Sequence, residues 1–472
     1  MKSETLAPIA PPPPTRVVLF DLAGPAPLLR PDDRYTAAMV VAVRDGIPRG
    51  SIDLDLLQGE PAIRRALEKL RDDTAEATPR PELFVPDSAL PSISVVVCTM
   101  LERPDELEIL LDVFAHVDYP RIEFLLVDNR RSIPVDDPLP DLIRTDPRVH
   151  SVRAVRPGIS SARNAGVAAA TGEIIVFTDD DVRVDPQWVR RIGARYASDP
   201  DLEAVTGLVL PSELKFPAQI WFERYYGGFY SARVFEPMTI QGAPRGSGPV
   251  RAAKAVVRGP AGEFLREMSI YGAGAFATGA NMTYRRDVLT RLGGFDLALG
   301  TGTPSRGGED LATVISLLWH GGKVGYEPAS VVHHRHRREL DELLSQMDGN
   351  GIGFTAMLTS LIVHEPKHLL ALSASAPAAA LRLGKAGLNR VRRSRTATTS
   401  GRGSGTGTDQ NPASAVSDAG EQYPRAMVTK ETRAFPRGPL AYLRSRRQMR
   451  TWRPSPRVGA PDPSGSETAV SV

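Results

Sequence analysis

The stretch Glu173-Ile174-Ile175-Val176-Phe177-Thr178-Asp179-Asp180-Asp181 decides the fold class. Its run of β-branched and aromatic residues predicts a strand that is buried on both faces. Three carboxylates follow at the C-terminal end, where their mutual repulsion requires a partner. Ligands of open α/β sheets bind at this end of the strands, and Mg²⁺ combines one or two carboxylates with phosphate oxygens. The stretch therefore predicts a metal–diphosphate site, although an acidic loop in which Asp181 caps a helix explains it equally well in isolation.

The composition narrows the class of protein. The 472 residues include 58 basic and 55 acidic side chains, a formal net charge of +3, so the chain as a whole does not look like a polyanion-binding protein. The single cysteine, Cys98, excludes an internal disulfide framework and is expected to be a core residue. We expect neither a secretory leader in residues 1–15 nor a membrane-spanning helix, because no apolar run reaches about 18 residues. Abundant Ala, Arg, Gly and Pro with few Lys predict a bacterial source of high GC content.

Composition shifts along the chain predict five segments. They are a disordered N-terminus (1–15), a small α+β unit with a linker (16–90), an α/β domain (91–365), a basic amphipathic helix (366–395) and a disordered basic tail (396–472). In the α/β domain, strand patterns at 93–98, 123–127 and 173–177 alternate with helix patterns at 104–114 and 160–170. Such alternation predicts a mainly parallel central sheet.

Polar residues also follow the other strand patterns. Thr99 follows the strand at 93–98, and Asp128 follows the strand at 123–127. Gly158 supplies a turn before the next helix, whose first turn contains Arg163 and suits a phosphate group. Each residue alone is an ordinary strand-end or helix-end residue. Their order along one sheet predicts a nucleotide site.

Together these motifs resemble family 2 glycosyltransferases of the GT-A fold over about residues 91–350. The motifs are Val95-Val96-Val97-Cys98-Thr99, Val127-Asp128-Asn129, Ser161-Ala162-Arg163-Asn164-Ala165-Gly166 and Phe177-Thr178-Asp179-Asp180-Asp181. The resemblance implies an inverting enzyme that transfers a sugar from a nucleotide-diphospho-sugar donor to a hydroxyl acceptor. It also implies a divalent metal cofactor, Mg²⁺ or Mn²⁺, and a role in the synthesis of cell-envelope polysaccharide, glycolipid or a related glycoconjugate.

The resemblance assigns roles residue by residue. The nucleotide-binding residues would be Thr99, Asp128, Arg163, Asp179 and Asp180. The metal ligand would be Asp181, the last acid of a DXD-like motif. The segment Asp128-Asn129-Arg130-Arg131-Ser132 departs from the family pattern, in which many relatives have a second acid and a glycine. The contact to the base therefore stays open.

The second half of the α/β domain supplies candidates for acceptor chemistry. Glu309 and Asp310 precede a helix expected at Leu311–His320, where the helix dipole alone would favour acids. In the resemblance they form the family's ED motif, with Asp310 as the general base and Glu309 as a sugar contact. Asn281, in a loop of small residues, is a further expected sugar contact. Trp221, with Tyr225 and Tyr226 near it in sequence, is either an acceptor platform or part of the core.

A basic cluster with three histidines follows the apolar pair Val331-Val332. His334 is the expected second metal ligand. His336 shares its strand face and His333 lies beside it, so the sequence does not separate the three. Arg335, Arg337 and Arg338 are expected to contact a phosphate of the donor or acceptor, unless the cluster is only a solvated basic patch.

Two other classes of protein remain. A nucleotidyltransferase would need a Gly-rich basic loop after the first strand, which residues 99–104 do not provide; a non-catalytic nucleotide-sugar or glycan-binding protein would be free to lose Asp181 or Asp310. The basic helix within 369–393 suits an anionic membrane surface. We therefore expect a cytoplasmic enzyme at the inner face of the plasma membrane, with a glycan or lipid-linked acceptor and no nucleic-acid partner.

Overall fold

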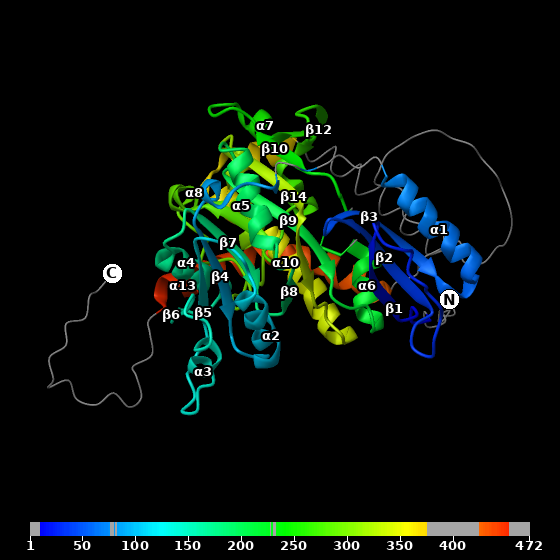
Figure 1. The fold of residues 1–472 in the computed structure, drawn as a ribbon. Coiled ribbons are helices and arrows are strands. Elements are labelled where there is room, and N and C mark those ends of the chain that lie inside the picture. Colours follow the sequence, from blue (N-terminus) through cyan, green and yellow to red (C-terminus); the bar gives the residue numbers. More distant parts are fainter. Residues whose placement is uncertain are drawn as a thin grey trace, which may run out of the picture.

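The computed structural model describes residues 10–75, 80, 83–226, 228–229, 233–374 and 424–452. The expected linker at 396–419 and most of the expected basic helix at 369–393 lie outside these residues, as do residues 1–9 of the expected disordered N-terminus. The structure contains a three-stranded N-terminal sheet and an 11-stranded main sheet (Figure 1).

The main sheet is mixed. Its order is β12-β11-β10-β14-β9-β13-β7-β4-β5-β6, with β8 paired to β14. The strands are β4 (Ile93–Thr99), β5 (Ile122–Asp128), β6 (Val149–Arg153), β7 (Ile174–Asp179), β8 (Val182–Val184), β9 (Ala204–Pro211), β10 (Met238–Gly242), β11 (Lys254–Arg258), β12 (Phe264–Ser269), β13 (Met282–Arg285) and β14 (Lys323–His334). Strands β6, β5, β4 and β7 pair in parallel, whereas β13 lies antiparallel between β7 and β9.

Strands β9 and β14 also pair in parallel, so the expectation of a mainly parallel sheet holds for β4 to β7 and for this pair but not for the rest of the sheet. Strands β10, β11 and β12 pair antiparallel with their neighbours. The connections from β10 to β11 and from β11 to β12 are shorter than the crossover of a dozen or more residues that parallel pairing needs. The sequence pattern missed this extension because it contains no long buried strand.

Helices cover both faces of the main sheet. They are α2 (Pro104–Ala115), α3 (Leu139–Ile143), α4 (Ile159–Ala169), α5 (Trp188–Ser198), α6 (Pro217–Tyr226), α7 (Pro249–Ala252), α8 (Arg286–Leu292), α9 (Glu309–Trp319) and α10 (Leu340–His364). In β7, Ile174 and Val176 join the core that contains α2 and α5, while Ile175 and Phe177 join the core that contains α4 and α9. This strand is thus buried on both faces, as its apolar run predicts.

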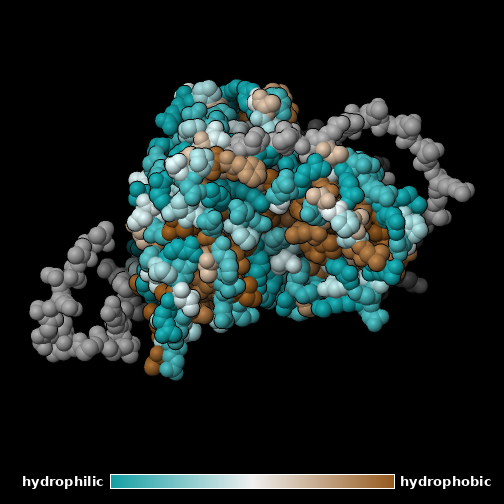
Figure 2. Space-filling model, in the orientation of Figure 1, coloured by the Kyte–Doolittle hydropathy of each residue, from teal (hydrophilic) through white to brown (hydrophobic). Residues whose placement is uncertain are grey.

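The N-terminal unit packs directly against the main domain. It consists of β1 (Thr15–Asp21), β2 (Ala37–Arg44), β3 (Ile47–Asp55) and α1 (Glu60–Asp73). Along β2, Val40 faces the core shared with α1, whereas Met39 and Val41 join the core of the main domain. Figure 1 shows α1 on the outer side of this sheet. Hydrophobic side chains are gathered over the unit in Figure 2, and Leu19 and Leu57 are among its exposed residues.

The segment after the N-terminal unit is anchored by one buried ion pair. Arg80 Nη2 lies 2.6 Å from Glu327 Oε2, and both side chains are almost fully buried. Glu327 lies in β14 at an irregularity of its pairing with β9. This contact ties the connection between the two units to the centre of the main sheet.

The C-terminal region contains two helices that the sequence prediction placed in a disordered tail. Helices α12 (Arg425–Ala434) and α13 (Gly438–Thr451) pack against α10. The Tyr442 side chain is fully buried, and its hydroxyl donates to Asp296 Oδ2 at 3.0 Å. The expectation of disorder is therefore wrong for 425–451. The high arginine content suggested disorder, but the segment also contains a small set of buried residues that includes Met427 and Tyr442. Among the described helices, none is both long enough and apolar enough to cross a membrane.

Candidate active site

The acidic end of β7 lies beside the end of β4. Cys98 of β4 pairs in register with Asp179 of β7. The Thr99 hydroxyl donates to Asp180 Oδ2 at 2.6 Å and accepts the Leu101 N–H at 2.8 Å. Thr99 and Asp180, which were predicted separately as nucleotide contacts, therefore form one hydrogen-bonded pair at the carboxyl edge of the sheet.

Asp179, Asp181 and His334 form a possible metal site. One ligand atom from each side chain lies within 4.8 Å of the other two. His334 Nε2 is 3.5 Å from Asp181 Oδ1 and 3.9 Å from Asp179 Oδ2. The arrangement follows from the pairing of β8 with β14, which sets His334 opposite Val182, the residue after Asp181.

The protonation of this cluster reflects burial and a shortage of positive charge. Burial, opposed by Arg163, raises the pKa of Asp179 to about 7. Burial likewise lowers the pKa of His334 to about 4, so the imidazole is neutral at pH 7. Its buried Nδ1 has no hydrogen-bond partner among the described residues. Two carboxylates and a neutral imidazole are a suitable donor set for a divalent cation.

Arg163 connects the acidic cluster with the Glu309–Asp310 motif. It is buried, its Nη1 donates to Glu309 Oε1 at 2.7 Å, and its Nη2 lies 3.9 Å from Asp179 Oδ1. A Cβ at Gly279 would lie 2.5 Å from Arg163 Nη2, so a larger residue there would displace the guanidinium group. Burial and the adjacent Asp310 raise the pKa of Glu309. Three motifs that are far apart in sequence thus meet around one guanidinium group.

Asp310 is held in a fixed orientation at the start of α9. Its Oδ2 accepts the Gly279 N–H at 2.8 Å, and its Oδ1 accepts the Leu311 N–H at 2.8 Å. The side chain is only partly buried, in contrast to Glu309. Each carboxylate oxygen keeps a further lone pair for a proton from a bound hydroxyl group.

Asp128 is at the same sheet edge but is already paired. Arg130 binds both of its carboxylate oxygens at 3.0 Å and also contacts Asp137 at 2.8 Å. Arg153 Nη1 lies 3.6 Å from Asp128. The sequence departure around Asn129 and Arg130 therefore builds a closed ion cluster. A contact between Asp128 and a nucleotide stays a prediction, and it would have to form beside these arginines.

Asn281 does not fit the predicted sugar contact. Its side chain has no exposed surface. Trp188 Nε1 donates to Asn281 Oδ1 at 3.0 Å, and Asn281 Nδ2 donates to the carbonyl oxygens of Leu208 and Ser330. The residue joins α5, β9 and β14, and a loop of small residues gives no sign in sequence of this internal role.

Trp221 also departs from its predicted place as an acceptor platform. It packs with Phe222, Met347 and Met427, and only 8% of its surface is exposed. The Tyr225 hydroxyl donates to Glu431 Oε2 at 2.7 Å, and the Tyr226 side chain is outside the described part of the chain. The alternative reading as core is correct for Trp221, because α10 and α12 cover it.

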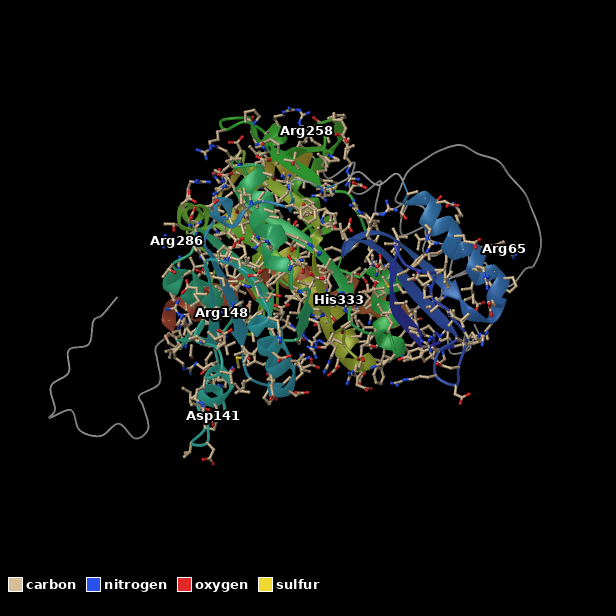
Figure 3. The ribbon with its side chains drawn as sticks, viewed as in Figure 1. Arg65, Asp141, Arg148, Arg258, Arg286 and His333 are labelled. Carbon is tan, nitrogen blue, oxygen red and sulfur yellow. The ribbon has the colours of Figure 1, made fainter. Side chains whose placement is uncertain are left out.

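The structure separates the three histidines. His334 faces the acids, whereas His336 Nε2 lies 2.6 Å from Glu223 Oε1 and is buried. Burial lowers the pKa of His336 to about 3. His333, near the centre of Figure 3, is set opposite Arg183 of β8 rather than at the acidic cluster. His334 is thus the one of the three histidines that lies beside the acids, and its role as a metal ligand stays a prediction.

One site residue was missed in the sequence. Arg103 Nη1 lies 3.0 Å from Asp181 Oδ2, and its side chain is 28% exposed. The arginine is in the loop between β4 and α2, where Leu101 has a positive φ of 53°. The sequence feature that could have identified Arg103 is its position, because it is the only cation between Thr99 and Pro104.

The fold and these strand-end residues resemble those of glycosyltransferases of the GT-A class. Residues 94–293 match the model of glycosyl transferase family 2. The chain is also 24% identical over 259 residues to the glucosyl-dolichyl phosphate glucuronosyltransferase of Haloferax volcanii, a match that covers 53% of this chain and 72% of that relative. Residues 94–293 are thus similar to glycosyl transferase family 2.

Two solved structures are more distant likenesses. The mannosyltransferase of Pyrobaculum calidifontis in complex with GDP-Man and Mn²⁺ is 22% identical, with a TM-score of 0.39 and coverage of 66% of this chain and 85% of that one. GalNAc-T7 with UDP, GalNAc and Mn²⁺ is 18% identical, with a TM-score of 0.37 and coverage of 57% and 48%.

Proposed function

We propose that this protein is an inverting glycosyltransferase that moves a sugar from a nucleotide-diphospho-sugar to a hydroxyl group. The observation that carries the proposal is the joint placement of two sites. Asp179, Asp181 and His334 form a cluster of metal-ligating side chains, and Arg163 links it to the start of α9, where Asp310 is oriented by two backbone N–H groups.

Asp310 acts in this mechanism as the general base. It accepts the proton of the acceptor hydroxyl as the oxygen attacks the anomeric carbon from the face opposite the nucleotide. The nucleoside diphosphate leaves with the bonding electron pair, so no covalent enzyme intermediate is needed. Arg103, beside Asp181, is placed to contact a diphosphate oxygen. A divalent cation, when bound, would neutralise charge on the diphosphate.

The donor atoms favour Mn²⁺ over Mg²⁺. Mg²⁺ is bound almost entirely through oxygen, whereas imidazole nitrogen is a better ligand for later first-row metals. His334 supplies such a nitrogen, since burial lowers its pKa to about 4. Asp179 and Asp181 would supply oxygens beside this nitrogen.

The acceptor is proposed to be a glycan or a lipid-linked glycan of the cell envelope. The name of the Haloferax volcanii relative, which specifies a glucosyl-dolichyl phosphate, supports the lipid-linked class. A cytoplasmic enzyme that works at the inner face of the plasma membrane would meet both this acceptor and soluble nucleotide sugars.

Release of nucleotide from a panel of nucleotide sugars tests the function. We expect release from one donor in Mn²⁺, less in Mg²⁺ and none in EDTA. Release that persists in EDTA would contradict the metal-assisted mechanism. Analysis of the product anomer by NMR tests inversion, because retention of the donor configuration would exclude a single displacement.

A further inference from the structure

A polar pocket of about 340 Å³ lies between the N-terminal unit and the α/β domain. On one side it is lined by Thr15, Arg16 and Val17 at the start of β1, with Tyr35 before β2. The other side comes from α2, β8 and the segments after β9 and β14. The Thr15 N–H donates to the Leu214 carbonyl oxygen at 2.8 Å, so backbone pairing fixes the two sides together.

The pocket has more cations than anions. Four cationic side chains of the α/β domain line it: Arg183, Lys215, Arg335 and Arg338. Only two carboxylates, Glu106 and Glu213, accompany them. Glu106 pairs with both Arg183, at 2.5 Å, and Arg335.

Glu213 is shared in the same way. Its carboxylate lies 2.7 Å from Lys215 Nζ and 2.8 Å from Arg338 Nη2. Four positive charges and two negative charges leave a surplus of two. Arg16, on the opposite side, is a fifth cation in the lining, but its charge is offset by its ion pair with Asp32. Asp32 itself does not line the pocket.

The cations are positioned by packing and are still reachable. Exposed fractions of the four side chains run from 22% to 40%. The Arg338 guanidinium lies over the Phe216 ring at 5.3 Å, and Arg16 lies over the Tyr35 ring at 5.2 Å. Arginine held in this way presents a planar fork of donors that matches phosphate oxygens.

The pocket adjoins the proposed reaction centre. Arg183 follows Asp181 by two residues, which is about 7 Å along a strand. Arg335 directly follows His334. Glu106, which pairs with both arginines, lies in the first turn of α2, three residues after Arg103, the cation beside Asp181.

We propose that this pocket binds a phosphate group of the acceptor substrate, and that the N-terminal unit forms one wall of the acceptor site. A phosphate monoester carries nearly two negative charges at pH 7, which matches the surplus of two cations. The pocket volume is sufficient for a phosphate with an adjoining sugar ring. The acceptor role rests on the proposed glycosyl transfer, whereas phosphate binding itself does not.

Titration calorimetry of the full chain with inorganic phosphate, in EDTA, tests the site. We expect the double variant Lys215→Ala/Arg338→Ala to bind phosphate at least tenfold more weakly than the unaltered protein. Glu213→Gln should bind it severalfold more tightly, because it frees two cations. Arg251→Ala is the matched control: Arg251 is exposed, pairs with Glu267 and lies in α7, far from β1 and α2 in Figure 1.

Opposite changes in the two pocket variants would support an anion site, since general loss of structure lowers affinity in both. Equal phosphate affinity in the unaltered protein and the double variant would overturn the proposal. Thermal unfolding of each variant shows whether it is folded. If Glu213→Gln and the control are folded but the double variant is not, the phosphate affinity of Glu213→Gln decides. Tighter binding than in the unaltered protein supports the anion site, and equal or weaker binding overturns it.

Two further arms identify the source of the phosphate. Competition by glucose 1-phosphate indicates a soluble sugar phosphate, and co-sedimentation with phosphatidic-acid vesicles that the double variant loses indicates a lipid phosphate. Calorimetry of the unaltered protein with UDP and GDP in Mn²⁺ tests the proposed function independently. Variant-dependent phosphate binding without Mn²⁺-dependent nucleotide binding would keep the phosphate pocket and overturn its acceptor role.

Discussion

Two groups of acids lie at the same edge of the main sheet, and they differ in how the chain compensates them. In the first group, Arg130 holds both oxygens of Asp128 and also binds Asp137. In the second group, Asp179 and Asp181 face His334, which is neutral because burial lowers its pKa to about 4. We call the first the closed group (Asp128, Arg130 and Asp137), because one arginine binds both of its acids. We call the second the open group (Asp179, Asp181 and His334): Arg103 lies 3.0 Å from Asp181 and Arg163 lies 3.9 Å from Asp179, but no single cation among the described residues binds both acids.

The difference shows that acids at strand ends do not by themselves identify a ligand site. The β5 and β7 strands both end in aspartate, and both ends suggested a nucleotide site. Arg130 raises the cost of disturbing Asp128, because removal of one partner from a buried pair leaves the other charge uncompensated. Asp179 has only Arg163 within 4 Å among the described cations that are charged at pH 7, and Glu309 shares that arginine.

The largest effect is expected from Asp181→Asn, which removes a charged ligand from the open group. Loss of the metal-supported diphosphate interaction should reduce kcat/KM by about 10⁴-fold. Mn²⁺-dependent binding of the nucleotide should fall with it in calorimetry. The matched variant Asp137→Asn, in the closed group, should keep Mn²⁺ binding; equal losses in both variants would remove the distinction between the two groups.

The next effect is that of Asp310→Asn. Asparagine can still accept one of the two backbone N–H groups, but it cannot take the acceptor proton. We expect kcat to fall by about 10³-fold with little change in the affinity for nucleotide and Mn²⁺. Single-turnover kinetics beside calorimetry separate the two quantities. Near-normal turnover in a folded Asp310→Asn protein would exclude Asp310 as the base.

Much of the α/β half of the fold could be predicted from the sequence because its signals are local. An apolar run followed by acids marks β7, and a glycine before Ile159 marks the start of α4. The end of each strand fixes which side chains reach the sheet edge. Thr99, Asp179 and Asp181 could therefore be placed there without coordinates.

The parts that could not be predicted depend on contacts between distant segments. Whether Asn281 meets a sugar or Trp188 is decided by α5, which is 93 residues away in sequence. Trp221 is covered by Met427 from the C-terminal helices, and no local pattern reports that packing. The pairing of Arg130 with Asp137 is a similar case, because spacing alone does not show which way a loop turns.

Arg130→Met should affect stability more than binding of the metal. Burial disfavours Asp128 and Asp137 as unpaired anions, and Arg130 holds the pKa of Asp137 below its ordinary value. Loss of this shared partner should lower the free energy of unfolding by about 3 kcal/mol. Chemical denaturation measures the change, with Arg131→Met, at an exposed neighbour, as the control.

A smaller effect of Arg130→Met than of its control would show that Asp128 is not stabilised by this arginine. Mn²⁺ binding at the open group should change less than threefold in Arg130→Met. A larger loss would mean that the two groups are coupled across β4, which lies between β5 and β7.

The smallest effect on stability is expected from Glu213→Gln in the cation-rich pocket. In this pocket the cations outnumber the carboxylates, unlike in the open group. Burial alone would raise the pKa of Glu213, but Lys215, Gln219 and Arg338 lower it to about 2. A carboxyl group with a lowered pKa stabilises the fold above its ordinary value, and that stabilisation is lost as the pH falls toward 2. Glu213→Gln should therefore cost about 1 kcal/mol at pH 7, or about 2 °C in Tm.

The difference in Tm between Glu213→Gln and the unaltered protein should shrink as the pH falls below about 4.5, where the unfolded carboxyl group begins to take up its proton. Glu263→Gln, at an exposed carboxylate on the β11–β12 connection, is the control and should show no such pH dependence. A constant difference from pH 7 to 3 would mean that the Glu213 carboxylate is not stabilised by its two cations. Lys215 and Arg338 would then be independent of Glu213, while Glu106 would still pair with Arg183 and Arg335.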